Sequence, residues 1–278
     1  MADYNVRYID YKYGAQIRIY SNTVDYHSVY KPKKISESDF IPLIDSDTLL
    51  DDDSARAENL SERSAQVSIN RTKNAIFSIA RANHWEYFFT LTFNPKKVDS
   101  KVYEIVSSKL SIWLNNLKKR YAPDLKYLFV PEFHADGQKL HFHGLVSNIG
   151  DIPLQDSGKV SLGKYVFDKE RMPNGTIIYN LPKWHFGWST ATKVRDSKRA
   201  SSYIVKYVTK DLQTLSRNKR RYLASNNLDL PAETYCKLSP EDAQKFINKY
   251  MSDFACIKTL GCPARDMTIK YIEVDKDV

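Results

Sequence analysis

Short stretches of alternating apolar and polar residues set the hydropathy pattern of the chain. Residues 5–20 alternate in this way and turn at Gly14, a pattern typical of a β-hairpin. Residues 85–93 form a mostly apolar run rich in aromatic and β-branched side chains, as expected of a central strand. Residues 126–134 and 140–148 flank an Asp-Gly turn signal and predict a second hairpin.

Apolar residues recur at helical spacing elsewhere. The predicted helices cover residues 57–83, 99–120, 198–215 and 240–250, and two further strands are predicted at residues 185–194 and 267–274. Asp99 or Ser100 could cap the second of these helices. Residues 149–184 have a loop-like composition. A Gly-x-x-x-x-Gly-Lys string there ends in Tyr165 instead of Ser or Thr and sits in a hairpin context, which excludes an ATP site.

The hairpin around the Asp-Gly turn carries the first candidate chemistry. His141 and His143 are two residues apart on a strand, so both side chains point to one face. If the Asp-Gly pair forms the centre of the turn, Glu132 lies across from His141 on that same face. Two imidazoles and a carboxylate predict a divalent metal site that would accept several ions. His134 shares the face of Glu132, either as a rival third ligand or as a residue supporting the ligands.

A second group of reactive residues lies about sixty residues further on. Tyr203 and Tyr207 are four residues apart on a predicted helix, as are Lys206 and Lys210, so each pair projects from one face. A tyrosine attacks poorly at neutral pH unless its target is activated, which a metal ion and a lysine could achieve at a phosphate. The alternative interpretation is that both tyrosines pack the helix onto the sheet.

Composition restricts the class of protein. The chain has 278 residues, of which 42% are hydrophobic and 27% charged, as in ordinary globular proteins. No apolar run approaches the roughly eighteen residues of a membrane helix, and the N-terminus lacks a secretory pattern, so we expect a cytoplasmic protein. The three cysteines form neither a paired framework nor a zinc pattern.

The net charge of +9 is unevenly distributed. Residues 35–58 contain eight acidic side chains against one arginine, which fits a mobile linker or an acidic flap that mimics nucleic acid. The remaining basic excess, with 13% aromatic residues, suits a polyanion whose bases stack on rings. A basic cluster past the tyrosines could hold DNA phosphates or could be a solvated surface. Its members are Arg217, Lys219, Arg220 and Arg221.

Together these features resemble the HUH endonuclease superfamily and, within it, the rolling-circle replication initiators. Three motifs occur in the order of the family, over about residues 85–211. They are Phe-Thr-Leu-Thr-Phe at 89–93, His-Phe-His at 141–143 with an upstream glutamate, and Tyr-x-x-Lys-Tyr-x-x-Lys at 203–210. The paired tyrosines are similar to the two-tyrosine branch found in replication proteins of small single-stranded DNA phages. Asn94 departs from the family, in which many members have an acidic residue after the first motif.

The resemblance implies an activity and a fold. Mg²⁺ or Mn²⁺ on His141, His143 and Glu132 would polarise a phosphate of single-stranded origin DNA, and Tyr207, with Tyr203 as its partner, would attack. The products are a 5′-phosphotyrosine link and a free 3′-hydroxyl for the host polymerase and helicase, without ATP. The family fold is α+β, with a central antiparallel sheet of about five strands and helices packed mainly on one face.

These motifs divide the chain into four expected parts: a β-hairpin appendage at residues 1–34, an acidic linker at 35–58, the HUH nuclease domain at 59–215 and a basic C-terminal extension packing on that domain at 216–278. Two other classes of protein also fit. One is an HUH transposase or relaxase, although a relaxase usually has three histidines and an N-terminal tyrosine. The other is a non-catalytic single-stranded nucleic-acid-binding protein whose aromatic strands act as stacking platforms.

Overall fold

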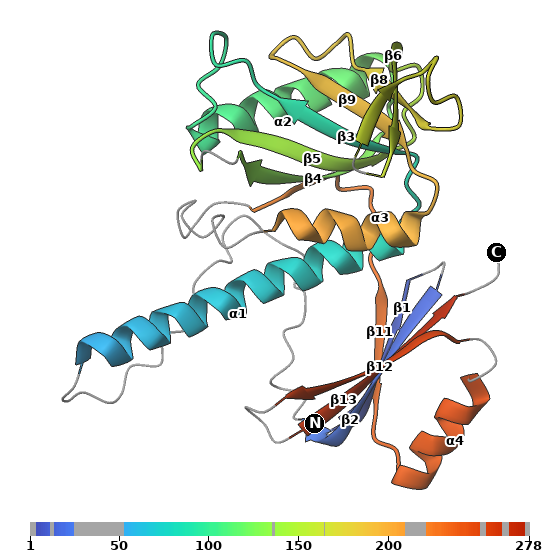
Figure 1. Ribbon diagram of the computed structural model, residues 1–278. Helices are drawn as coiled ribbons and strands as arrows, with labels where there is room; N and C mark the ends of the chain where they lie inside the picture. Colours follow the sequence, from blue (N-terminus) through green and yellow to red (C-terminus); the bar gives the residue numbers. More distant parts are fainter. Residues whose placement is uncertain are drawn as a thin grey trace. The chain divides into compact units, whose positions relative to one another are not determined.

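The chain forms two compact units, one of residues 1–49, 81–83 and 229–278 and the other of residues 50–80 and 84–228. The computed structural model describes residues 4–11, 14–24, 53–134, 137–163, 165–208, 221–250, 254–262 and 267–275 (Figure 1). The expected acidic linker therefore lies almost wholly outside the described residues. In the part of the chain that is described, no helix is both long and apolar enough to cross a membrane.

The first unit contains a five-stranded antiparallel sheet and one helix. Its strands lie in the order β11-β1-β2-β13-β12. Their bounds are Tyr4–Asp10 (β1), Gly14–Val24 (β2), Ala232–Cys236 (β11), Phe254–Cys262 (β12) and Met267–Asp275 (β13), and α4 spans Pro240–Tyr250. Val6, Ile17 and Ile272 pack in a core with Ala243 and Phe246 of α4. The predicted N-terminal hairpin is confirmed, but it forms the middle of a sheet completed by C-terminal strands instead of a separate appendage.

The second unit contains an eight-stranded antiparallel sheet in the order β10-β4-β5-β3-β9-β8-β6-β7. The strands are β3 (Tyr87–Thr92), β4 (Lys126–Phe133), β5 (Leu140–Ser147), β6 (Gln155–Leu162), β7 (Tyr165–Asp168), β8 (Thr176–Asn180), β9 (Ser189–Lys193) and β10 (Leu223–Ala224). The α+β class is confirmed, but the expected sheet of about five strands is too small. Residues 155–180, expected as loop, supply three strands that are held by cross-strand pairing although most of β6 and β7 is exposed.

Helices cover both faces of this sheet, which corrects the expectation that they lie mainly on one (Figure 1). On one face, Val106 and Leu110 of α2 (Tyr103–Arg120) pack against Phe142. On the other face, α1 (Asp53–Ala82) and α3 (Ser197–Ile204) contribute Ile76 and Ile204 to a core with strand residues. Every residue of β5 is buried, so its two faces both require covering.

Two helix ends differ from the prediction. Val102 occupies the N-cap of α2 without a side-chain cap, because Asp99 instead accepts from the backbone of Lys101 and the Ser100 carbonyl accepts from Leu140 on the neighbouring strand. Asp196 caps α3, which ends at Ile204 and continues as a 3₁₀ turn over Val205–Tyr207, short of residue 215. The tyrosine pair therefore lies where the helix tightens and ends.

Candidate metal centre and tyrosine pair

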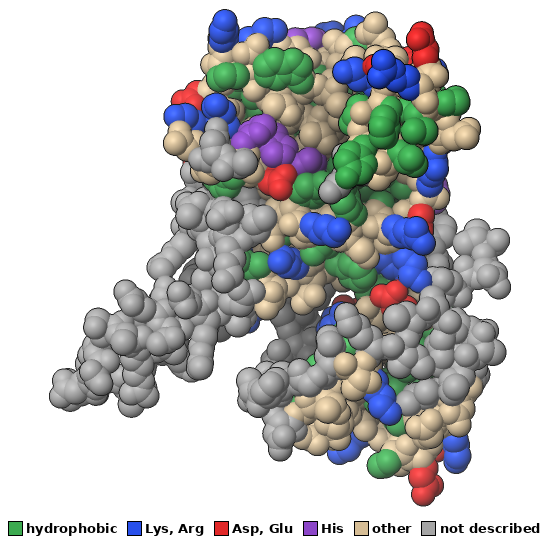
Figure 2. Space-filling view, viewed as in Figure 1, with side chains coloured by type: hydrophobic (Ala, Val, Ile, Leu, Met, Phe, Trp, Pro, Cys, Tyr) green, Lys and Arg blue, Asp and Glu red, His purple; other side chains and the backbone are tan. Residues whose placement is uncertain are grey.

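The β4–β5 hairpin brings the predicted ligands together. The register pairs Glu132 with His141 and Val130 with His143, as the Asp-Gly turn predicts. On the other side of β5, β3 places Thr92 opposite His141 and Thr90 opposite His143. Directly paired residues share a face of the sheet, so the carboxylate and the two imidazoles converge. Figure 2 shows histidine side chains next to an acidic one on the surface of this unit.

The spacing of the donor atoms fits a metal ion. Oε2 of Glu132 lies 2.8 Å from Nε2 of His141 and 2.8 Å from Nε2 of His143, and the two nitrogens are 2.8 Å apart. Neighbouring ligands of a six-coordinate ion such as Mg²⁺, at 2.0–2.1 Å from the metal, are about 3 Å apart. The three side chains thus form a group that could hold a divalent ion. Two histidines with one carboxylate are a known ligand set for such ions.

Electrostatics favour ligand behaviour. Burial, with the neighbouring His143 and His134, lowers the pKa of His141 to about 4, so its ring is neutral at pH 7. Burial acts to raise the pKa of Glu132, but its hydrogen bond to His143 and the charges of both histidines outweigh burial and lower it. A neutral imidazole and an ionised carboxylate are the forms that bind metal.

Second contacts of the histidines differ. Thr90 Oγ1 lies 3.1 Å from Nδ1 of His143, so this nitrogen can donate to it while Nε2 stays free for a ligand. Nδ1 of His141 is buried without a hydrogen-bond partner among the described residues. The ring of His134 lies 4.3 Å from that of His141, centroid to centroid, and His134 is outside the three-ligand group. Thr90 was not predicted as a site residue, although it belongs to the Phe-Thr-Leu-Thr-Phe motif.

The end of α3 places both tyrosines beside this group. Tyr207 stacks on His143 with ring centroids 3.6 Å apart and an interplanar angle of 18°. Tyr203 meets Tyr207 edge-on at 5.4 Å and is 45% exposed. The amino group of Lys206 lies 5.1 Å from the centre of the Tyr203 ring. Burial, then the hydrogen bond to Tyr203 and the charge of Glu132, raise the pKa of Tyr207.

The predicted basic cluster is described only at Arg221. Its Nη1 donates to Ser68 Oγ at 3.0 Å and Thr72 Oγ1 at 3.4 Å on α1, and burial lowers its pKa. This contact holds the guanidinium to a helix, whereas the sequence predicted a free phosphate-binding residue. The other proposed basic residues and one catalytic candidate lie outside the described residues: Lys210, Arg217, Lys219 and Arg220.

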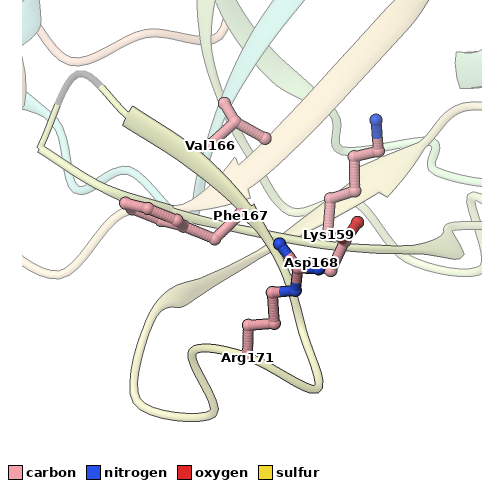
Figure 3. Close-up of a pocket in the computed structure, with 5 residues that line it drawn as sticks. All are labelled: Lys159, Val166, Phe167, Asp168 and Arg171. Carbon is pink, nitrogen blue, oxygen red and sulfur yellow. The ribbon is translucent and has the colours of Figure 1, made fainter.

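A surface pocket elsewhere on the eight-stranded sheet contains none of the predicted site residues. Figure 3 shows its lining side chains, which reach from β6, β7 and the turn after β7. They are Lys159, Val166, Phe167, Asp168 and Arg171. The candidate chemistry therefore lies at the open histidine face, not in this pocket.

Comparison with known proteins points to the same segment. No curated protein and no solved structure matches the chain. A family model does match, over residues 86–212, which is just under half of the chain and includes the metal group and both tyrosines. This central segment is similar to the family of replication-associated proteins of the ORF2 type.

Proposed function

We propose that the chain is a rolling-circle replication initiator that nicks and rejoins single-stranded DNA at an origin. One observation carries the proposal: a tyrosine ring lies directly on a histidine of the Glu132, His141 and His143 group. The similarity of residues 86–212 to the ORF2-type replication-associated proteins supports it. A packing role alone would not require two imidazoles and a carboxylate beneath the ring.

The metal group would set the position of the scissile phosphate. Glu132, His141 and His143 would hold Mg²⁺ or Mn²⁺, which when bound polarises the phosphate and offsets its charge. Thr90 fixes the tautomer of His143 that leaves Nε2 available. Lys206, on the turn between the tyrosines, adds a cation for the developing negative charge.

In the covalent step, the phenol oxygen of Tyr207 forms a bond to phosphorus and the P–O3′ bond breaks. The phenol gives up its proton and the leaving oxygen gains one, so the products are a 5′-phosphotyrosine and a 3′-hydroxyl. The phosphodiester energy is retained in the new bond, and no ATP is needed. Tyr203, in edge contact with Tyr207, would cut a second time while the first link is still held, and the released 3′-hydroxyl would reseal the strand.

This activity implies the partners. Single-stranded origin DNA is the substrate, and the host polymerase and helicase extend and unwind from the 3′-hydroxyl. We place the reaction in the cytoplasm of the host cell. Lys210 and the cluster Arg217, Lys219 and Arg220 remain candidates for contacts with DNA, as does His134 beside the metal group.

The test is a covalent adduct. Incubating the full chain with circular single-stranded DNA and Mn²⁺ should give a protein–DNA species that survives a denaturing gel and disappears with chelator. His141→Ala should abolish it, while His84→Ala, which changes an exposed histidine outside the metal group, should not. Strong binding without any adduct, unaffected by chelator, would favour a non-catalytic binding protein instead.

A further inference from the structure

Trp188 differs from the other tryptophans of the chain. Three of the four are buried, and each indole N–H donates to a backbone carbonyl: Trp85 to Ala80, Trp113 to Lys183 and Trp184 to Thr92. The side chain of Trp188 is 64% exposed, and within the described part of the chain it has neither a ring contact nor a partner for its indole nitrogen. An exposed, unpaired tryptophan gives up a large burial free energy, which suggests that a ligand covers it.

The sheet register puts Trp188 on the face of the metal group. Glu132 pairs with His141, and His141 pairs with Thr92. The backbone N–H of Thr92 donates to the carbonyl of Trp188 at 2.8 Å, and the pair Leu91 with Ser189, one residue earlier, has the same register. Glu132, His141, Thr92 and Trp188 therefore form one row across four strands, on one face. Two strand spacings separate Trp188 from His141, roughly 10 Å.

The backbone at Trp188 is held firmly although its side chain is free. A Cβ on Gly187 would lie 2.2 Å from the Thr92 carbonyl oxygen, so only glycine allows this close approach. Ser189 Oγ lies 3.0 Å from the backbone nitrogen of Leu181 and accepts its hydrogen bond. A ring on a fixed backbone needs little ordering when it binds a flat ligand, which limits the entropy cost of binding.

The surface between the metal group and Trp188 is low and polar. It carries Thr92 and, in the next row, Thr90 and the exposed Thr190, which pair with each other. Lys97 is exposed on the adjoining loop, and its amino group donates to the carbonyl of His185 at 3.0 Å. Small hydroxyl side chains, a nearby cation and an open aromatic ring suit a nucleic acid strand, because phosphates bind cations and bases stack on rings.

We infer that Trp188 is a stacking subsite for a base of the single-stranded DNA whose phosphate lies at the metal group. This inference deepens the proposed function and rests on it. The base that stacks belongs to a nucleotide close to the scissile phosphate, so Trp188 fixes which phosphate the metal group receives. Trp188 is a positioning residue for the strand and takes no part in bond making. Stacking accepts any base, so the subsite sets strand position more than sequence.

The experiment is a double-mutant cycle on binding, measured by fluorescence anisotropy with chelator present so that no strand is cut. The probes are labelled oligo(dT) and an oligonucleotide of equal length in which every site is abasic. Trp188→Ala should weaken oligo(dT) binding roughly 5- to 150-fold, the range expected for one stacked base. Trp188→Phe should retain most of the affinity. On the abasic probe, Trp188→Ala should bind as wild type does.

Tyr165→Ala is the matched control, because Tyr165 is 60% exposed on the same sheet but lies on the opposite face by register. It should leave binding of both probes unchanged, and thermal unfolding would confirm that each variant folds. Equal affinity of Trp188→Ala and wild type for oligo(dT) would overturn the subsite, as would an equal loss on the abasic probe. A nicking-competent Trp188→Ala with normal affinity would refute the subsite and leave the nuclease standing, whereas a base-dependent loss without nicking in wild type would do the reverse.

Discussion

Gly144, between His143 and Leu145 on β5, offers a sharp test of how the sheet holds the metal ligands. A Cβ built on Gly144 would lie 2.2, 2.3 and 2.6 Å from three ring carbons of Phe129, which is fully buried on β4. Carbon atoms prefer separations of about 3.5–4.0 Å, so Gly144→Ala overlaps the ring by more than an ångström. The ring or the strand must move in a closely packed core.

Such overpacking typically costs about 1–3 kcal/mol. For a unit of this size each kcal/mol lowers the melting temperature by about 2–4 °C, so we expect Gly144→Ala to melt roughly 2–12 °C below wild type. All four tryptophans lie in residues 84–228, so tryptophan fluorescence during heating reports on this unit. Movement of β5 also displaces His143, and we expect metal affinity to fall.

A double-mutant cycle identifies the cause. Phe129→Leu alone should destabilise the unit through lost packing, but combined with Gly144→Ala it makes room for the new methyl group. The double variant should therefore lose less stability than the two single variants together, by more than about 0.5 kcal/mol. Additive losses, or a Gly144→Ala melting temperature equal to that of wild type, would show that the Phe129 ring does not confine this strand.

Three further outcomes are expected. Thr90→Val, which removes the contact with His143 Nδ1, should weaken Mn²⁺ binding about 10- to 100-fold by calorimetry, and Thr192→Val should not; equal affinities would refute the role of Thr90. Mn²⁺ at a hundred times its Kd should add about 2.7 kcal/mol to wild-type stability, and a similar gain in Glu132→Gln would exclude this carboxylate as a ligand. Arg221→Ala should cost about 1 kcal/mol in thermal unfolding and leave oligonucleotide affinity unchanged, whereas a large loss of affinity would restore Arg221 as a DNA contact.

Local patterns were sufficient for the metal group. The Asp-Gly turn fixes the register of one hairpin, and a strand period of two then determines which side chains meet, so the sequence alone places Glu132, His141 and His143 together. Thr90 was missed because its contact with His143 depends on pairing between β3 and β5, which are far apart in sequence. Trp188 was within a predicted strand, but its face depends on that same long-range pairing.

Other features escaped prediction for physical reasons. β6 and β7 lack an apolar alternation because they lie at the edge of the sheet, largely exposed, and their stability comes from backbone pairing. The N-terminal hairpin was recognised, but its pairing with β11 and β13 joins residues more than two hundred positions apart, which no local pattern encodes. The short α3 reflects a change to 3₁₀ geometry at Val205, where tertiary contacts outweigh helical spacing.

The most direct test of the account is to identify the residue that carries DNA in the covalent adduct. Mass spectrometry of the peptides from the Mn²⁺-dependent adduct should find the nucleotide on Tyr207 in the wild-type chain and on Tyr203 in Tyr207→Phe, and the double substitution should form none. An adduct on any other residue, or an undiminished adduct in the double variant, would contradict the proposal that the tyrosines at the end of α3 attack a phosphate held at the Glu132, His141 and His143 group.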